Sequence, residues 1–129
     1  MPRVLVFGTF DGLHDGHRFF LEEAAEYGDL HVVVARDATV QRTKGVLPQH
    51  MEQERRAAIQ AAYPGAQVLL GDAKDYMVPV RNIQPDVICL GYDQVLPPGV
   101  FESMFPCPVE RLPSHEPEKF KSSLLRKPL

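Results

Sequence analysis

Short apolar runs separated by amphipathic segments dominate the pattern of the chain. The runs lie at residues 4–7, 30–35, 66–70 and 86–90, and a last strand is expected at 109–112. Apolar runs without polar alternation are typical of parallel strands that are buried on both faces of a sheet. Two parallel strands joined by a helix form a right-handed βαβ unit. The pattern therefore predicts an α/β fold.

The segments between the runs predict helices. Asp15 is expected to be the N-cap of a helix that ends near Gly28. Further helices are expected at residues 51–62, at 75–83, within 95–106 and from Ser122 onward. In residues 38–50 the apolar positions recur with no clear period. We interpret this segment as a mobile loop that carries cations; the alternative is a solvated connection without a functional role.

Composition indicates one globular domain. The chain has 129 residues, of which 44% are hydrophobic and 24% are charged, enough for one sheet covered on both faces. We therefore predict a single domain over residues 1–129. A protein with a net charge of −3 has no overall positive charge that would attract nucleic acid or an anionic membrane. Any anion site must therefore be formed by local cations.

Nothing in the sequence indicates export or a metal centre. No apolar run approaches the roughly 20 residues of a membrane span, and the first strand starts too early to follow a signal peptide, which predicts a cytoplasmic protein. Cys89 lies inside an apolar run and Cys107 lies between two prolines, and a disulfide is disfavoured in that compartment. Because no His/Cys cluster has zinc spacing, no metal site is expected.

The residues that carry chemistry gather after the first strand. Gly8 ends that strand, and a short loop leads to His14, Gly16 and His17 at the start of a helix. Histidines three residues apart lie roughly on one face of a helical turn, beside the free amides and partial positive charge of the helix N-terminus. These features predict a site for phosphate oxygens. Two ordinary surface or capping histidines, or a metal-binding pair, are the alternatives.

The same stretch resembles a family signature. The matching residues are Gly8-Thr9-Phe10-Asp11-x-x-His14-x-Gly16-His17. They resemble the signature of the HxGH nucleotidylyltransferases, in the cytidylyltransferase-like branch. The resemblance implies a Rossmann-like three-layer sandwich with a mostly parallel five-stranded sheet. It also implies that His14 and His17 contact the triphosphate and stabilise the transition state without covalent attachment, while the rest of the signature binds the nucleotide.

A second block follows the second strand. Its residues are Ala35-Arg36-Asp37-x-Thr39-Val40, Lys44-Gly45, Pro48 and Glu52-x-x-Arg55. The block resembles the corresponding part of the same branch. The resemblance implies that Lys44 reaches triphosphate oxygens and that Arg55 supports the phosphate site. A lysine on a mobile loop fits a cation that closes over the bound substrate.

A third candidate site is the loop Gly91-Tyr92-Asp93-Gln94, which follows the fourth strand. Glycine permits close backbone approach, Tyr92 offers a stacking ring, and Asp93 and Gln94 offer polar contacts to a ribose or base. A turn whose aspartate caps a helix is the alternative. The sequence looks more like that of archaeal-type FAD synthetases than the Gly-Asp-Asp type usual in glycerol phosphate cytidylyltransferases.

The C-terminal segment matches the family least well. Ser122 and Ser123 precede an apolar pair and resemble the serine/threonine cluster that opens a phosphate-binding helix in the family. The Arg-Thr-x-Gly that usually precedes the cluster in glycerol phosphate cytidylyltransferases is absent. Lys119 and Lys121 are candidate replacements for its cation.

The sequence thus predicts a nucleotidyltransferase, in which an acceptor phosphate attacks the α-phosphorus of a nucleoside triphosphate and expels pyrophosphate. ATP with FMN is the first choice, and CTP with glycerol 3-phosphate or a similar phosphorylated alcohol is the second. A non-catalytic nucleotide-binding module is a third alternative. We expect Mg²⁺ or another divalent cation to accompany the triphosphate, held mostly by substrate oxygens and water, with Asp11 as an indirect ligand. Family relatives also suggest a homodimer.

Overall fold

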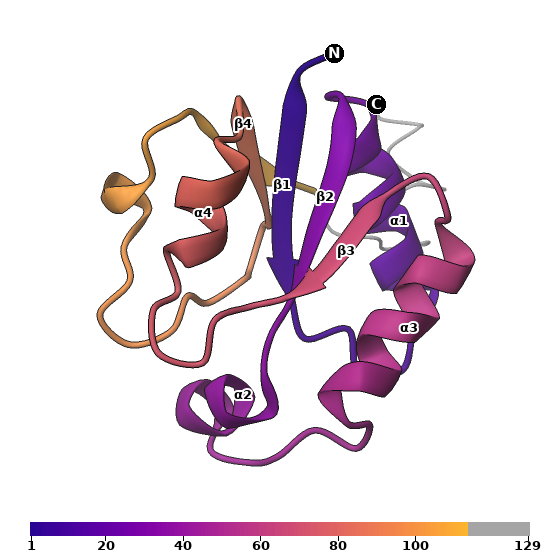
Figure 1. Ribbon diagram of the computed structural model, residues 1–129, viewed down its shortest axis with the longest axis vertical. Coiled ribbons are helices and arrows are strands. Elements are labelled where there is room, and N and C mark those ends of the chain that lie inside the picture. The colour runs from indigo at the N-terminus through magenta and orange to yellow at the C-terminus, as the bar shows by residue number, and fades with distance from the viewer. Residues whose placement is uncertain (114–129) are drawn as a thin grey trace, which may run out of the picture.

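A sheet of five parallel strands forms the centre of the computed structural model, which describes residues 1–113 (Figure 1). The strands are β1 (Arg3–Gly8), β2 (Asp29–Val34), β3 (Gln67–Leu70), β4 (Val87–Gly91) and β5 (Val109–Leu112). Their order across the sheet is β3-β2-β1-β4-β5, and every neighbouring pair is parallel. The predicted α/β fold and its strands are confirmed.

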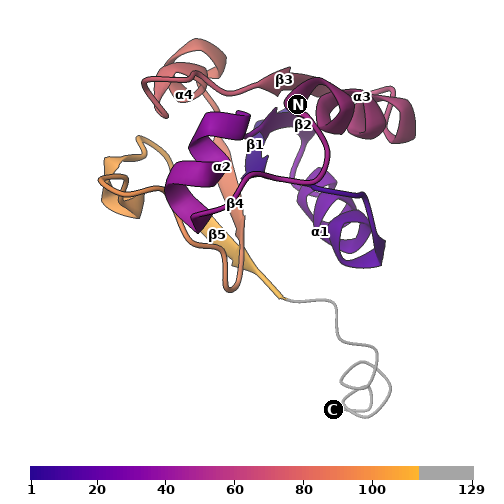
Figure 2. The same cartoon turned by 90° about the horizontal axis from the view of Figure 1, so that it is seen from below.

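Helices cover both faces of this sheet. They are α1 (Asp15–Ala25), α2 (Asp37–Lys44), α3 (Glu52–Ala62), α4 (Val78–Ile83) and the 3₁₀ turn η1 (Glu102–Met104). Figure 2 shows α1 and α3 on one face of the sheet, α4 and η1 on the other, and α2 across the end at which the strands finish. The chain therefore has the three layers expected of a doubly wound sheet.

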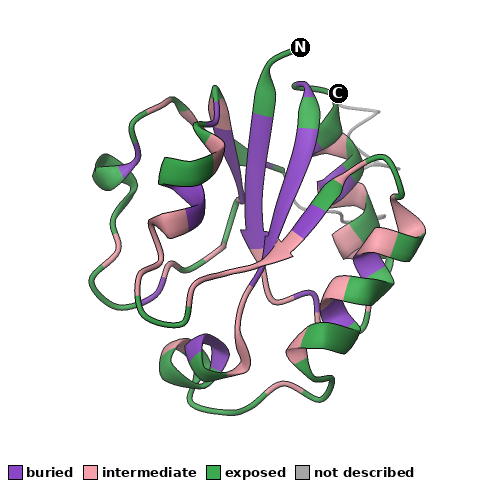
Figure 3. Cartoon of the chain, viewed as in Figure 1, coloured by how far each residue is buried: buried purple, intermediate pink, exposed green. Residues whose placement is uncertain are grey.

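The central strand explains why its sequence has no polar alternation. Val4 and Val6 pack into the cluster beneath α1 and α3, whereas Leu5 and Phe7 point to the opposite cluster beside α4. All four side chains are buried, as the strand interiors in Figure 3 show. Because successive residues of a strand face opposite sides, both sets must be apolar when both faces are covered.

Two predicted elements differ from the structure. Residues 38–50 do not form one loop, because residues 38–44 belong to α2, which is followed by its C-cap Gly45 with φ 83°. Its apolar period is weak because much of its inward face is polar, with Thr39 buried beside Val40. The segment 95–106 holds only the 3₁₀ turn η1 rather than a surface α-helix.

The remaining helices agree better with the prediction. Helix α3 begins at Glu52 and ends at Ala62. Helix α4 begins only at Val78, with Pro79 in its first turn, where a proline ring is tolerated. The helix predicted from Ser122 lies outside the described residues. Within residues 1–113 no helix has the length and apolar character that a membrane crossing requires.

Gly28 joins α1 to β2 at a place that accepts no side chain. Its φ is 153°, and a Cβ atom there would lie 2.2 Å from the backbone oxygen of Pro2. That oxygen accepts a hydrogen bond from the amide of Asp29 at 2.8 Å, so it is fixed beside the glycine. Gly28 therefore sets the spacing between the end of α1 and the start of β1.

We expect Gly28→Ala to lower the free energy of unfolding by more than about 1 kcal/mol, because the backbone conformation is incompatible with a Cβ atom. Gly65→Ala is the matched control, since a Cβ at Gly65 would meet no atom within 4 Å. Urea unfolding of both variants measures the difference. Equal stability of the two variants would contradict the close approach at Gly28.

Candidate functional site

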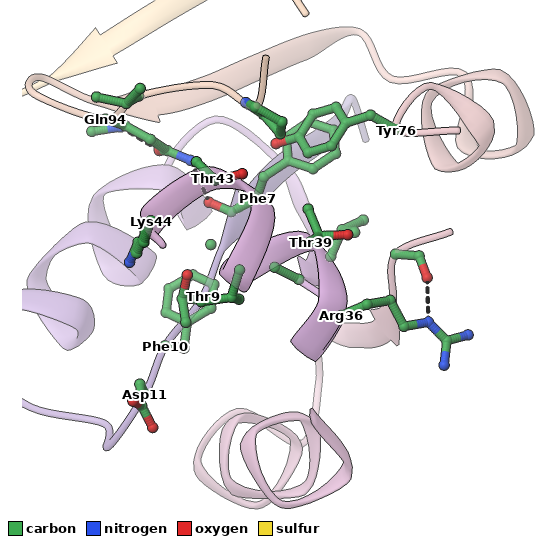
Figure 4. Close-up of a pocket in the computed structure, with 18 of the residues that line it drawn as sticks. Phe7, Thr9, Phe10, Asp11, Arg36, Thr39, Thr43, Lys44, Tyr76 and Gln94 are labelled. Carbon is green, nitrogen blue, oxygen red and sulfur yellow. Dashed lines mark hydrogen bonds between the residues drawn. The ribbon is translucent and has the colours of Figure 1, made fainter. Parts of the chain in front are cut away.

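A cavity of about 640 Å³ opens where the strands end (Figure 4). Residues from the ends of β1, β2 and β4, from the segment after β3, and from α1 and α2 surround it. The predicted site residues that line it are Gly8, Thr9, Phe10, Asp11, His17, Lys44, Gly91, Asp93 and Gln94. The volume lies within the usual range for small-molecule sites, about 300–1,000 Å³. Residues far apart in the sequence are thus brought to one place.

Four other predicted residues lie near this cavity without lining it. They are His14, Gly16, Arg55 and Tyr92. Ser122 and Ser123 lie outside the described residues. His14 stacks on the lining residue His17, and Arg55 donates to the lining residue Thr9, so both contact residues that line the cavity.

His14 is the N-cap of α1, so the prediction that Asp15 caps this helix is wrong. Its Nδ1 accepts hydrogen bonds from the amides of Gly16 at 3.0 Å and His17 at 3.4 Å. The Nδ1 of His17 in turn accepts from the amide of His14 at 3.4 Å. This reciprocal arrangement is a capping box built from two imidazoles.

The capping box decides which donors remain for a phosphate. The amides of Gly16 and His17 are already bonded to His14, so they are not the free amides that the sequence suggested. Both Nδ1 atoms face the backbone, which leaves Nε2 of each ring for a ligand. The rings stack with centroids 3.7 Å apart. A Cβ at Gly16 would lie 3.0 Å from the His14 ring, so this glycine makes room for the imidazole.

The electrostatic setting of His17 favours its neutral form. Burial lowers its pKa to about 4, and the neighbouring His14 adds to the shift. The edge of the Phe10 ring contacts the imidazole, with centroids 5.3 Å apart. Phe10 has φ 51°, and a Cβ atom at Gly8 would lie 2.5 Å from its ring. Gly8 therefore makes room for the ring that shields His17.

Asp11 hydrogen-bonds to the segment that connects α2 to α3. Its carboxylate accepts the amides of Gln49 at 2.7 Å and His50 at 2.9 Å. The hydrogen bond from Gln49 is the main cause that lowers the pKa of this carboxyl. Asp11 therefore stays ionised beside the cavity while it holds residues 49 and 50.

Lys44 is the last residue of α2, so it stands on a helix rather than on a mobile loop. Its side chain is exposed and lines the cavity together with Phe10 and Asp11 (Figure 4). Thr39, Val40 and Thr43 line the cavity from the same helix. The expected closing motion of Lys44 thus has to be a movement of α2 or of the lysine side chain alone.

Arg55 is a buried support for the site. Its guanidinium donates to the carbonyl oxygens of Thr9 at 2.8 Å and His50 at 2.9 Å. It also pairs with the carboxylate of Asp37 at 2.7 Å, and the arginine side chain is 0% exposed. Arg55 therefore joins the loop after β1 to the starts of α2 and α3, and it acts on a ligand only through these groups.

The loop after β4 is held from two sides. The Gln94 side chain accepts the amide of Gly91 at 3.0 Å and donates to the carbonyl of Phe7 at 2.9 Å. From the other side, Arg111 donates to the carbonyls of Gly91 at 2.7 Å and Gln94 at 2.8 Å. Tyr92 is 56% exposed and does not line the cavity.

Several residues of the site are not predicted from the sequence. Arg111, which pairs with Glu102 at 2.5 Å, holds the loop after β4. The sequence of its four-residue strand does not indicate this role. Tyr76 falls in a segment for which the sequence predicts only a helix, yet it stacks on Phe7 with ring centroids 4.6 Å apart and lines the cavity. The position of Thr43 four residues after Thr39 is the one signal that could have placed both on a single helix face.

Comparison with known proteins decides the family. The cytidylyltransferase-like family matches residues 5–127. The chain belongs to this family. A FAD synthase from Methanospirillum hungatei is 38% identical over 130 residues, which cover 95% of this chain and 81% of that protein. FAD synthases from Methanohalophilus mahii and Ferroglobus placidus are 43% and 46% identical, over 74% and 73% of this chain.

The chain spans 66% and 61% of the Methanohalophilus and Ferroglobus proteins, so it covers less than two thirds of each. A crystal structure of the lipopolysaccharide core biosynthesis protein from Thermoplasma volcanium matches with a TM-score of 0.81 and 34% identity, over 90% of this chain and 99% of that chain. These comparisons confirm the predicted cytidylyltransferase-like family, its Rossmann-like fold and the enzyme class, a nucleotidyltransferase.

We expect the His17 ring to remain neutral in the free enzyme between pH 7.5 and 5.5, because its pKa is lowered to about 4. NMR spectra of the imidazole protons, assigned with a His17→Asn variant, measure this. Added ATP should raise the pKa, because phosphate charge stabilises the imidazolium. A midpoint near 6.5 in the free enzyme would contradict the burial of His17.

Proposed function

We propose that this protein is an FMN adenylyltransferase, which makes FAD and pyrophosphate from ATP and FMN. The observation that carries the proposal is the stacked His14–His17 pair, whose second ring lines the cavity, in a chain that is 38–46% identical to several FAD synthases. FAD synthesis requires attack by the FMN phosphate on the α-phosphorus of ATP. No covalent intermediate with the protein is needed.

The side chains around the cavity supply charge stabilisation and positioning. Nε2 of His17 and His14 would donate to oxygens of the triphosphate as negative charge moves toward the leaving pyrophosphate. Lys44, which lines the cavity from the end of α2, would neutralise the β- and γ-phosphates. Arg55 and Asp11 hold the loops that carry these groups. Positioning of two bound substrates accounts for most of the rate in such a transfer.

A divalent cation, Mg²⁺ or a similar ion, is part of the proposal. Residues 1–113 contain no cluster of three or more His, Cys, Asp or Glu residues that could hold a metal ion. Asp11 lies at the cavity, but each of its oxygens already accepts an amide. We therefore expect the cation to be bound mainly by triphosphate oxygens and water, and to contact Asp11 only through a water molecule. The cation would supply neutralising charge to the triphosphate.

We assign the nucleoside to the loop after β4, where Gly91, Asp93 and Gln94 line the cavity. Tyr92 then serves only if it turns inward, because it is exposed in the present conformation. Ser122 and Ser123 remain predicted phosphate contacts. FMN is left with the part of the cavity between α2 and the segment after β3.

The protein is further proposed to act as a cytoplasmic, single-domain homodimer that binds neither nucleic acid nor membranes. Four exposed apolar side chains near η1 and the loop after β4 support a self-association surface; they are Tyr92, Val95, Phe101 and Met104. The net charge of −3 gives no reason to expect binding to a polyanion.

Pyrophosphate release tests the function when ATP or CTP is combined with FMN or glycerol 3-phosphate in the presence of Mg²⁺. Of the four substrate pairs, we expect only ATP with FMN to release pyrophosphate. A His17→Ala variant controls for contaminating enzymes, because loss of one preorganised donor should reduce kcat by about 10²–10³. Turnover with CTP and glycerol 3-phosphate would favour a cytidylyltransferase instead. Nucleotide binding without turnover of any pair would favour a non-catalytic module.

A further inference from the structure

One wall of the cavity contains three hydroxyl groups that bond to nothing within residues 1–113. They belong to Thr39, Thr43 and Tyr76, all of which line the cavity. We call them the hydroxyl wall. Among the described residues no hydrogen bond is found for the Thr39 and Tyr76 hydroxyls, and the Oγ1 of Thr43 is in addition buried without a partner. Figure 4 shows the three side chains around the part of the cavity that lies between Lys44 and Arg36.

Tyr76 is the best placed of the three. Its ring stacks on Phe7, with centroids 4.6 Å apart and an angle of 25° between the planes. A tyrosine hydroxyl in such partly buried surroundings usually finds a hydrogen-bond partner. Burial alone raises the pKa of Tyr76, so the group stays protonated and can donate. The ring is fixed by Phe7, while its polar end has no partner within residues 1–113.

The two threonines contribute their hydroxyls from α2. They lie one helical turn apart, and Thr39 is only 5% exposed. Helical threonines often bond to the carbonyl four residues earlier, but Thr43 does not, and its Oγ1 is buried without a partner among the described residues. Buried polar groups without partners are uncommon in folded proteins and call for an explanation.

We propose that the hydroxyl wall recognises the flavin ring of the acceptor, with Tyr76 as the main specificity-determining residue. This inference rests on the proposed function. A flavin ring has an apolar benzenoid edge and a pyrimidine edge that carries carbonyl and N–H groups. Phe7, Val33 and Val40 line the same cavity with apolar surface. The wall therefore offers apolar contact together with hydroxyls that a flavin can pair.

The nucleoside is a poorer occupant of this wall. In Figure 4, Gln94 and Lys44 lie toward one side of the cavity and Tyr76 and Arg36 toward the other, with Thr43 on the side of Lys44. His17 lines the cavity as well and is assigned to the phosphates. With the nucleoside on the loop after β4, the part of the hydroxyl wall around Tyr76 is left for the second substrate.

Tyr76→Phe tests this directly, because it removes the hydroxyl and keeps the ring that stacks on Phe7. We expect the Kd for FMN, measured by flavin fluorescence, and the KM for FMN to rise roughly five- to tenfold, as for loss of one hydrogen bond. The KM for ATP should stay within about twofold. Thr39→Val, which removes a hydroxyl at nearly constant volume, should change the same two quantities in the same direction.

Tyr63→Phe is the matched control. The Tyr63 hydroxyl pairs with Glu22 at 3.3 Å, and the residue does not line the cavity. Unchanged FMN binding in Tyr76→Phe would overturn the inference, and so would a rise in the KM for ATP instead of FMN. Wild-type enzyme that neither binds nor adenylylates FMN would overturn the proposed function and the inference together, which separates that failure from a failure of the variant alone.

Discussion

The site depends on one buried cation. Arg55 has no exposed side-chain surface and satisfies two backbone carbonyls and the carboxylate of Asp37. A buried guanidinium is costly unless it is paired and fully hydrogen-bonded. The loop after β1 and the starts of α2 and α3 must therefore meet at fixed positions around it. Those segments carry Thr9, the first residue of the helix that ends at Lys44, and the residues bonded to Asp11. One charge on α3 therefore shapes a cavity that it does not line.

The capping box is the second constraint, and it links helix formation to chemistry. His14 and His17 satisfy the amides at the start of α1 through their Nδ1 atoms. The same contacts fix both rings and leave their Nε2 atoms for a ligand. The groups that we propose to bind phosphate are thus preorganised by the start of a helix, so little ordering is needed when the substrate arrives. This arrangement suits a reaction in which positioning and charge carry most of the rate.

Much of the fold could be predicted because the strands have two buried faces. Val4 to Phe7 and Leu30 to Val34 are apolar at nearly every position, and the histidine signature is local in sequence. Helix α2 could not be predicted because Thr39 and Thr43 give its inward face no apolar period. Arg111 and Tyr76 join the site through long-range contacts with Gly91, Gln94 and Phe7, which no local pattern records. The reciprocal roles of the two histidines also required the geometry of the turn.

Direct attack by the FMN phosphate on the α-phosphorus of ATP is the step on which the proposed chemistry depends. ATP radiolabelled at the α-phosphorus, incubated with FMN and the protein, tests it most simply. We expect the label to appear in the flavin dinucleotide and the released pyrophosphate to be unlabelled. Label that ends on the protein would contradict direct transfer, and label found only in free AMP would show that water, rather than the flavin phosphate, is the acceptor.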